Sequence, residues 1–247
     1  MKVLATYSIK GGVGKTTSAV NLAHEASRAG ARVLVWDLDP QGAATYLFRV
    51  KPKVKGGAAR MVGAKGELAA HIRATDVAAV HLVPADLSLR HLDLHLDDTK
   101  RPTERLASLL ATVARHYDVA LLDCPPSISL ASESVFGAAD ALLVPVIPAT
   151  LSSRALNQIS RFLDGLPSPP DVLPYFSMVD RRKRLHRELT VSLAAEWPGF
   201  LTTIIANASA IERMGPKRSS VATVAPKGPA ARAFHDLWSE VAVRLWA

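Results

Sequence analysis

Cysteine is almost absent from this chain of 247 residues, which contains only Cys124. One thiol cannot form an internal disulfide, and such a chain is typical of a reducing compartment. An iron–sulfur cluster shared by two subunits needs two cysteines from each, so an iron–sulfur reductase is disfavoured. The eight histidines show no metal-ligand spacing, which argues against a structural zinc site.

Long hydrophobic runs are lacking as well. No apolar stretch reaches the roughly 18 residues that a membrane-spanning helix needs. The chain passes from Met1 directly into an apolar strand pattern, without the longer apolar stretch and the cleavage site of a secretory signal. We therefore expect a cytoplasmic protein.

What the chain does contain is apolar bulk and positive charge. Hydrophobic residues make up 49% of the sequence, which excludes a disordered chain, and the length suits one α/β domain spanning residues 1–247. The net charge of +8 favours an anionic partner, which could be nucleic acid, acidic lipid or an acidic protein. The alternative is a basic protein whose charge only keeps it in solution.

Apolar runs alternate with helical patterns along the chain. Continuous apolar strands separated by helices predict an α/β fold, a doubly wound and mostly parallel sheet with helices on both faces. The predicted strands are 3–7, 32–37, 80–84, 119–123, 141–146 and 172–179, and the predicted helices are 14–29, 103–116, 152–163 and 229–246. Residues 51–66, which are rich in lysine, glycine and alanine, are predicted to form a mobile loop.

The most specific motif is Lys10-Gly11-Gly12-Val13-Gly14-Lys15-Thr16-Thr17, between a predicted strand and a predicted helix. Glycines allow successive backbone N–H groups to turn inward around phosphate oxygens, and the helix N-terminus adds its positive dipole end. In such a loop Lys15 reaches the β- and γ-phosphates, and the Thr16 hydroxyl is a ligand of Mg²⁺. The motif therefore predicts a nucleotide-binding P-loop.

The loop departs from the common pattern, because Ile9 replaces its first glycine and Lys10 stands early in the loop. In this it resembles the deviant Walker A motif of the ParA/MinD family of ATPases. Residues 33–42 resemble the second nucleotide motif of that family, 117–127 its Walker B segment, and 178–181 the strand and loop near the base. The chain differs from the usual family sequence at 41–43 and 205–207.

The resemblance implies ATP and Mg²⁺ as cofactors and a role for each matching residue. Lys10 would reach the partner's nucleotide across a dimer interface, and Asp39 would orient or activate the attacking water. The implied catalytic residues are Lys10, Lys15 and Asp39; those binding the nucleotide are Lys10, Gly11, Gly12, Val13, Gly14, Lys15, Thr16, Thr17 and Asp180; those holding the metal are Thr16, Asp37 and Asp123. The alternative role for Asp37 and Asp39 is to cap a helix or a turn.

The densest cationic cluster consists of Arg181, Arg182, Lys183, Arg184, His186 and Arg187, and we call its five arginine and lysine residues the late basic cluster. Such a cluster suits non-specific binding to DNA phosphates, which needs charge but no reading of bases. The alternative is a solvated helix face. A sparser patch at Lys51, Lys53, Lys55, Arg60 and Lys65 is typical of an ordinary solvent-facing loop. Neither group is interleaved with aromatic residues, so stacking on bases is not expected.

The C-terminal pattern carries an apolar stripe at helical spacing, made of Phe234, Leu237, Trp238, Val241, Leu245 and Trp246. MinD-type relatives bind membrane through an amphipathic tail. This stripe has no linker before it and little cationic charge, so we expect it to pack on the sheet edge and membrane binding to be unlikely.

Together these features predict a slow, partner-stimulated ATPase that closes as a homodimer on ATP, binds double-stranded DNA of the bacterial nucleoid non-specifically, and positions a cargo. The stimulating partner is unidentified. A MinD-like regulator at the membrane surface is the first rival, and a P-loop metabolic ligase, which Lys10 and the Asp37/Asp39 pair disfavour, is the second.

Overall fold

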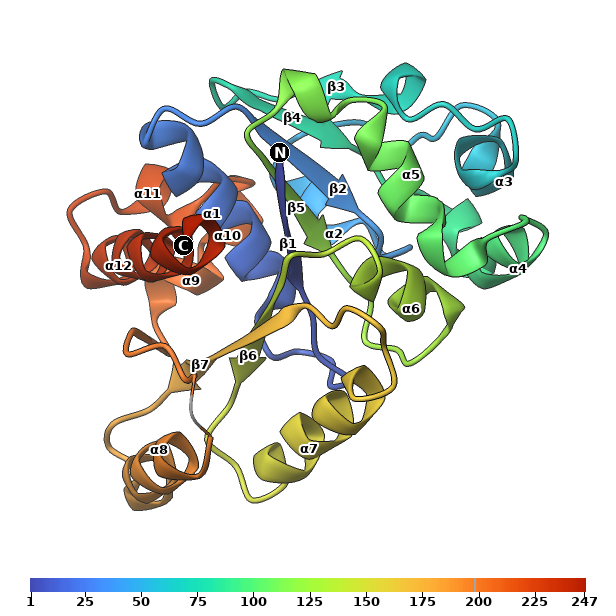
Figure 1. The fold of residues 1–247 in the computed structure, drawn as a ribbon. Helices are drawn as coiled ribbons and strands as arrows, with labels where there is room; N and C mark the ends of the chain where they lie inside the picture. The colour runs from blue at the N-terminus through green and yellow to red at the C-terminus, as the bar shows by residue number, and fades with distance from the viewer. Residues whose placement is uncertain (198) are drawn as a thin grey trace.

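The computed structural model describes residues 1–197 and 199–247, and its centre is one eight-stranded sheet (Figure 1). The strand order is β3-β4-β2-β5-β1-β6-β7-β8, and every neighbouring pair is parallel except β3 with β4. The strands are β1 Lys2–Thr6, β2 Val33–Asp37, β3 Arg73–Ala74, β4 Val80–Val83, β5 Val119–Asp123, β6 Ala141–Val146, β7 Asp171–Val179 and β8 Ile204–Ala206. The predicted doubly wound, mostly parallel α/β fold is confirmed.

Helices cover both faces of the sheet (Figure 1). The α-helices are α1 Lys15–Arg28, α2 Ala43–Leu47, α3 Gly57–Val62, α4 Leu92–Asp97, α5 Arg105–Ala111, α6 Leu130–Phe136, α7 Ser152–Leu163, α8 Arg184–Glu196, α9 Ser209–Glu212, α10 Met214–Lys217, α11 Val221–Val224 and α12 Pro229–Trp246. Short 3₁₀ turns occupy η1 Ala69–His71, η2 Leu87–His91, η3 Pro102–Glu104 and η4 Ala114–His116.

Two hydrophobic cores lie on the two faces because side chains alternate along each strand. In β2, Leu34 and Trp36 join the core beneath α5, α6 and α7. Val33 and Val35 join the core beneath α1 and α12. A sheet buried on both sides explains why its strands appear in the sequence as continuous apolar runs.

The prediction of a mobile loop at 51–66 is wrong, because this segment contains helix α3. Ala58, Met61 and Val62 are fully buried, and Val54 is buried before them. Their spacing gives the short helix one apolar face, which the many lysines and glycines hide in the sequence. The predicted helix 103–116 is likewise interrupted, forming η3, α5 and η4 in succession.

The C-terminal helix α12 packs on α1 and on the edge strand β8, as expected. Phe234, Leu237, Trp238 and Val241 of its apolar stripe are buried, whereas Trp246 is 49% exposed. Within the described residues no helix combines the length and the apolar character that crossing a bilayer requires.

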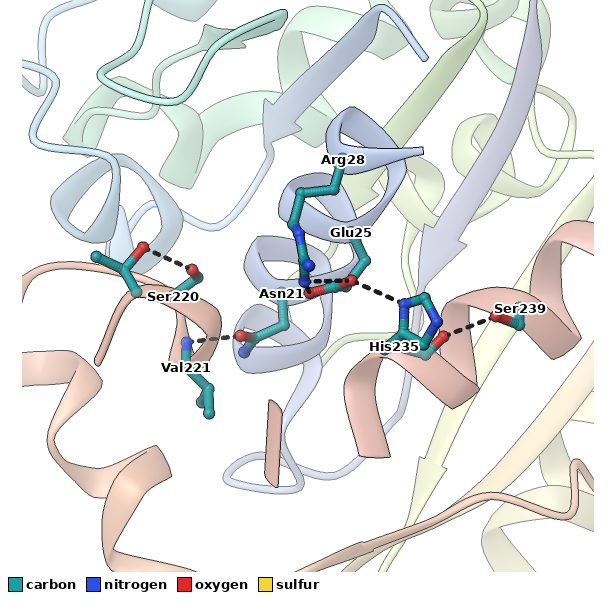
Figure 2. Close-up of polar contacts among 8 residues, drawn as sticks. Asn21, Glu25, Arg28, Ser220, Val221, His235 and Ser239 are labelled. Atoms are coloured by element: carbon teal, nitrogen blue, oxygen red, sulfur yellow. Dashed lines mark hydrogen bonds and ion pairs between the residues drawn. The ribbon is translucent and has the colours of Figure 1, made fainter. Parts of the chain in front are cut away.

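Polar contacts also hold α1 against the C-terminal part of the chain (Figure 2). The buried Glu25 carboxylate contacts Arg28 and, across the helix interface, Nδ1 of His235 at 3.1 Å. The side-chain oxygen of Asn21 accepts a hydrogen bond of 2.8 Å from the backbone N–H of Val221. Contacts with α11 and α12 therefore fix helix α1, and the P-loop leads into the N-terminus of that helix.

Candidate nucleotide site

Three strands place polar side chains at one edge of the sheet. Asp37 ends β2 and Asp123 ends β5, and these two residues are register partners. Thr6, at the end of β1, is the register partner of Asp123 on its other side. Because parallel strands bring their carboxyl ends to the same edge, this is where an open α/β sheet binds a ligand.

The P-loop bends from β1 into α1 through two glycines in the left-handed region. Gly12 has φ +68 and Gly14 has φ +102. A Cβ atom at Gly14 would lie 2.9 Å from Oγ of Ser177, so this position excludes a side chain by contact as well as by conformation. Gly14 is also the N-cap of α1, which directs the positive end of the helix dipole toward the loop.

Lys15 is nearly buried, with 7% of its surface exposed. Its Nζ donates a hydrogen bond of 3.1 Å to the backbone carbonyl of Lys10, so the ammonium group is held inside the loop. Burial lowers the pKa of Lys15, and the nearby Asp123 carboxyl opposes this shift. A buried cation with one carbonyl partner is well suited to take a phosphate oxygen as its next partner.

The two strand-end aspartates are both buried. Burial raises the pKa of Asp37 to about 6, against hydrogen bonds from Thr45 that lower it. Burial also raises the pKa of Asp123 well above its ordinary value, and the charge of Asp37 adds to that rise. Because each carboxylate disfavours the charge of the other, a cation bound between them would stabilise the charged form of both.

These residues fit a magnesium ion by their chemistry. Magnesium prefers oxygen ligands. Oδ2 of Asp123 is buried and has no hydrogen-bond partner within the described part of the chain, while Oδ1 accepts a hydrogen bond of 3.4 Å from the Thr6 hydroxyl. Asp37 is also a capping residue, because its Oδ2 accepts from the N–H (2.7 Å) and the hydroxyl (2.6 Å) of Thr45 in α2. The capping role and the metal role are therefore both open to Asp37.

A cavity of about 290 Å³ lies over the P-loop. It is lined by Gly11, Gly12, Val13, Gly14, Lys15, Thr16, Thr17 and Asp39, together with Pro126 and Met178. Lys10 lines a neighbouring, mostly apolar cavity of about 150 Å³ beside α7, with Val146 and Ile159 among the other lining residues. The structure thus places Asp39 in the lining of the P-loop cavity, whereas Lys10 lines only the neighbouring cavity.

Asp180 is not among the residues lining the P-loop cavity, although Met178 is. The Asp180 carboxylate instead accepts two hydrogen bonds of 3.0 Å from the Arg182 guanidinium, which hold the pKa of Asp180 at about 2. Met178 has φ +56, a backbone conformation that is uncommon for a residue with a side chain. Within the segment 178–181, Met178 therefore lines the cavity, whereas Asp180, which was expected to bind the nucleotide, does not.

The late basic cluster is exposed but partly paired. Arg182 binds Asp180, and Arg184 binds Glu188 at 2.6 Å. Arg187 donates to the backbone carbonyls of Arg181 and Arg182. Arg181, Lys183 and Arg187 make no ion pair with a carboxylate of the described residues, and of these three Arg181 and Lys183 are also not held by backbone carbonyls through their side chains.

Sequence reasoning missed four residues that shape the site. Thr45 bonds to Asp37, Thr6 approaches Asp123, Ser177 leaves no room for a side chain at Gly14, and Pro126 lines the cavity. Pro126 could have been found, because it lies in the segment that resembles Walker B. The others carry no local signal, since their contacts come from separate strands and helices.

The geometry is that of a P-loop nucleotide-binding fold, and comparisons agree. The AAA domain family matches residues 1–168. The sporulation initiation inhibitor protein Soj of Bacillus subtilis is 33% identical over 159 residues, covering 64% of this chain and 63% of Soj. The chromosome partitioning protein ParA of Caulobacter vibrioides is 29% identical over 205 residues, covering 80% of this chain and 77% of ParA.

Among solved structures, the cobyrinic acid a,c-diamide synthase of Mycobacterium smegmatis with bound ADP and magnesium has a TM-score of 0.82 and 26% identity. The alignment covers 100% of this chain and 95% of that one. With the P-loop, the strand-end aspartates and these relatives together, the chain belongs to the ParA/MinD family of P-loop ATPases. The synthase has also been solved with a bound ATP analogue and magnesium.

Proposed function

We propose that this protein is a single-domain, ATP-driven switch that dimerises on ATP, binds nucleoid DNA without sequence preference, and positions a cargo until hydrolysis releases it. The observation that carries the proposal is the P-loop cavity, whose lining includes the buried Lys15 and Asp39, at the sheet edge where two buried aspartates end neighbouring strands. Hydrolysis would be slow in isolation and stimulated by a partner. The place of action would be the bacterial cytoplasm, on the nucleoid.

Within one subunit, we assign phosphate binding to the loop amides and to Lys15, with Thr17 beside the α-phosphate. Phosphoryl transfer depends mainly on positioning and on positive charge around the phosphates. Bound Mg²⁺ would neutralise phosphate charge, and Thr16, Asp37 and Asp123 are the residues that would hold it. Asp39 would position the attacking water. Its Oδ1 accepts from the N–H of Gln41 at 2.9 Å, and within the described residues Oδ2 has no such bond.

Lys10 is assigned to the partner's nucleotide rather than to its own. Its side chain is half-buried beside the neighbouring cavity, not in the P-loop cavity. A second cation arriving from another subunit can stabilise charge on the leaving phosphate, as an arginine finger does. Dimerisation and hydrolysis would then depend on the same residue.

The dimer proposal is tested by light scattering with ATP. Asp39→Ala is expected to bind ATP, hydrolyse it poorly and accumulate as a dimer. Lys10→Ala is expected to bind nucleotide as a monomer. Normal dimerisation and normal hydrolysis by Lys10→Ala would refute its role across the interface.

The DNA proposal is supported by the uncompensated charge of Arg181 and Lys183. A dimer presents two such clusters on one body, so the second binds at high effective concentration once the first is bound. Filter binding of random duplex DNA is expected to be tighter with ATP than with ADP and to weaken steeply with salt. Equal affinity in the two nucleotide states would contradict the coupling.

A charge reversal at Arg181 and Lys183 is expected to remove DNA binding and leave ATP-driven dimerisation intact. The matched control is Lys100→Glu with Lys227→Glu, which reverses the same charge at exposed positions elsewhere. Arg182 and Arg184 are avoided because each is already paired with a carboxylate. If the control lost DNA binding equally, net charge rather than this cluster would be responsible.

The membrane-surface rival is tested with anionic liposomes in the same ATP and ADP conditions. Burial of the α12 stripe against α1 and β8 disfavours it, because the apolar face is already used. Co-sedimentation with liposomes, without DNA binding, would favour the rival.

A further inference from the structure

Another hollow, of about 640 Å³, lies at the β3 edge of the sheet, and we call it the basic pocket. It is lined by Phe48, Arg49, Val50, Lys51, Lys53, Lys55, Arg73, Ala74, Thr75 and Asp76. Five of these residues are cations and one is an acid, so the lining has a net charge of +4. β3 is at the opposite edge of the sheet from β8. The cations that line this pocket are therefore distinct from the late basic cluster, which follows β7.

The three lysines line the pocket from one short segment that is anchored in the core at Val54. Val54 is buried, and its backbone N–H donates to the Asp86 carboxylate at 2.7 Å. The chain turns tightly on either side of Val54, because the N–H of Lys53 bonds to the carbonyl of Lys51 (2.8 Å) and that of Gly57 to the carbonyl of Val54 (2.9 Å). These turns leave the three lysines exposed, while Pro52 lines a different hollow.

The two arginines are held by hydrogen bonds at the rim. Arg73 donates from Nη1 to the carbonyls of Ala70 (3.0 Å) and Ile72 (2.8 Å). Arg49 has φ +58, and it donates to the carbonyls of Lys217 and Arg218 while its Nη1 lies 3.4 Å from Asp76. Asp76 thus balances Arg49, and the charge of the lysines and Arg73 is left without a carboxylate partner among the described residues.

The geometry points to a binding site for a compact, multiply phosphorylated small molecule in the basic pocket. A concave site of this volume lies within the range of about 300–1,000 Å³ that small-molecule sites occupy. Clustered lysine ammonium groups attract several phosphate groups as point charges. The aromatic residue of the lining, Phe48, is 3% exposed, so the pocket offers phosphate recognition without a surface for stacking a base.

The test uses inorganic tripolyphosphate as the probe, in isothermal titration calorimetry of the full chain. Mg²⁺ is omitted and ADP is held in excess to fill the P-loop. One saturable tripolyphosphate site per chain is expected, with an affinity that falls as salt rises because the charges are exposed. The variant Lys51→Gln/Lys53→Gln/Lys55→Gln is expected to bind at least about tenfold more weakly.

The matched control is Lys65→Gln/Lys100→Gln/Lys227→Gln, which removes the same charge from three exposed lysines elsewhere. It should bind tripolyphosphate as the unmodified chain does, and thermal melting checks that both variants fold. Absence of a saturable site, or equal weakening in both variants, would overturn the proposal. So would loss of duplex DNA binding in the first variant with tripolyphosphate binding unchanged, since the surface would then belong to nucleic acid.

Discussion

Lysine is used in two different ways in the P-loop and in the basic pocket. Lys15 is 7% exposed and hydrogen-bonded to a carbonyl, whereas Lys51, Lys53 and Lys55 are exposed. A buried charge interacts strongly with its few partners because little water screens it, while exposed charges act weakly and collectively. Single substitutions should therefore have large effects in the P-loop and small effects at the surface.

The largest effect is expected for Lys15→Ala. Removing the buried ammonium group should weaken ATP binding by at least about 100-fold, since charge-assisted phosphate contacts are lost without replacement. Titration of a fluorescent ATP analogue measures this, with Lys65→Ala as the exposed control. Near-normal affinity in Lys15→Ala would overturn the P-loop assignment.

Gly14→Ala should be the next largest change, and it affects folding rather than charge. The new Cβ would meet Ser177 Oγ at 2.9 Å in a backbone with φ +102. We expect the free energy of unfolding to fall by about 2–4 kcal/mol, which lowers the melting temperature by roughly 5–15 °C.

Gly30→Ala is the matched control for Gly14→Ala. Gly30 has φ +92, but a Cβ there has nothing within 4 Å, so this variant isolates the cost of the left-handed conformation. We expect Gly30→Ala to melt above Gly14→Ala. If the two melted together, the contact with Ser177 would carry no cost.

Asp123→Asn is expected to stabilise the nucleotide-free protein modestly, by about 1–3 kcal/mol at pH 8. Burial raises the folded-state pKa of Asp123 and of Asp37, so the folded protein holds protons that the unfolded chain releases. Stability therefore falls as pH rises, for Asp37 from its ordinary 3.8 through about 6. The melting temperature, measured at several pH values between pH 4 and pH 8, should fall less steeply with pH in Asp123→Asn than in the unmodified chain. A steeper slope would contradict this account.

The smallest effect is expected at the surface pair Arg184–Glu188. The Arg184 side chain is 85% exposed, and pairs of this kind contribute little because water and salt screen them. Arg184→Gln should shift the melting temperature by less than about 2 °C. A shift as large as that of Gly14→Ala would erase the distinction between the two regions.

The strands and the P-loop could be predicted from the sequence because their signals are local. A buried parallel strand is a continuous apolar run, and the loop needs glycine at fixed positions such as Gly12 and Gly14. The nucleotide and metal roles of the individual side chains stay predictions. What the structure adds to them is proximity, as for Asp37 and Asp123 in register.

Features that depend on distant contacts could not be predicted. The lysines around α3 gave no indication that Met61 is fully buried. Charge alone did not show that Arg182 pairs with Asp180, or that Arg49 and Arg73 join the lysines of another segment around one pocket. Pairing and convergence are properties of the folded chain, because each needs residues from separate elements.

The carboxylate of Asp37 makes contacts whose consequence reaches beyond the P-loop. It accepts from the N–H of Asp39 and from Thr45, and the Thr45 hydroxyl in turn accepts from the N–H of Ala85. The side chain that ends β2 therefore also holds helix α2 by hydrogen bonds. Arg49, at the rim of the basic pocket, follows two residues after the end of that helix. If Asp37 changes its partners, the contacts that hold α2 change as well, and α2 leads into the basic pocket.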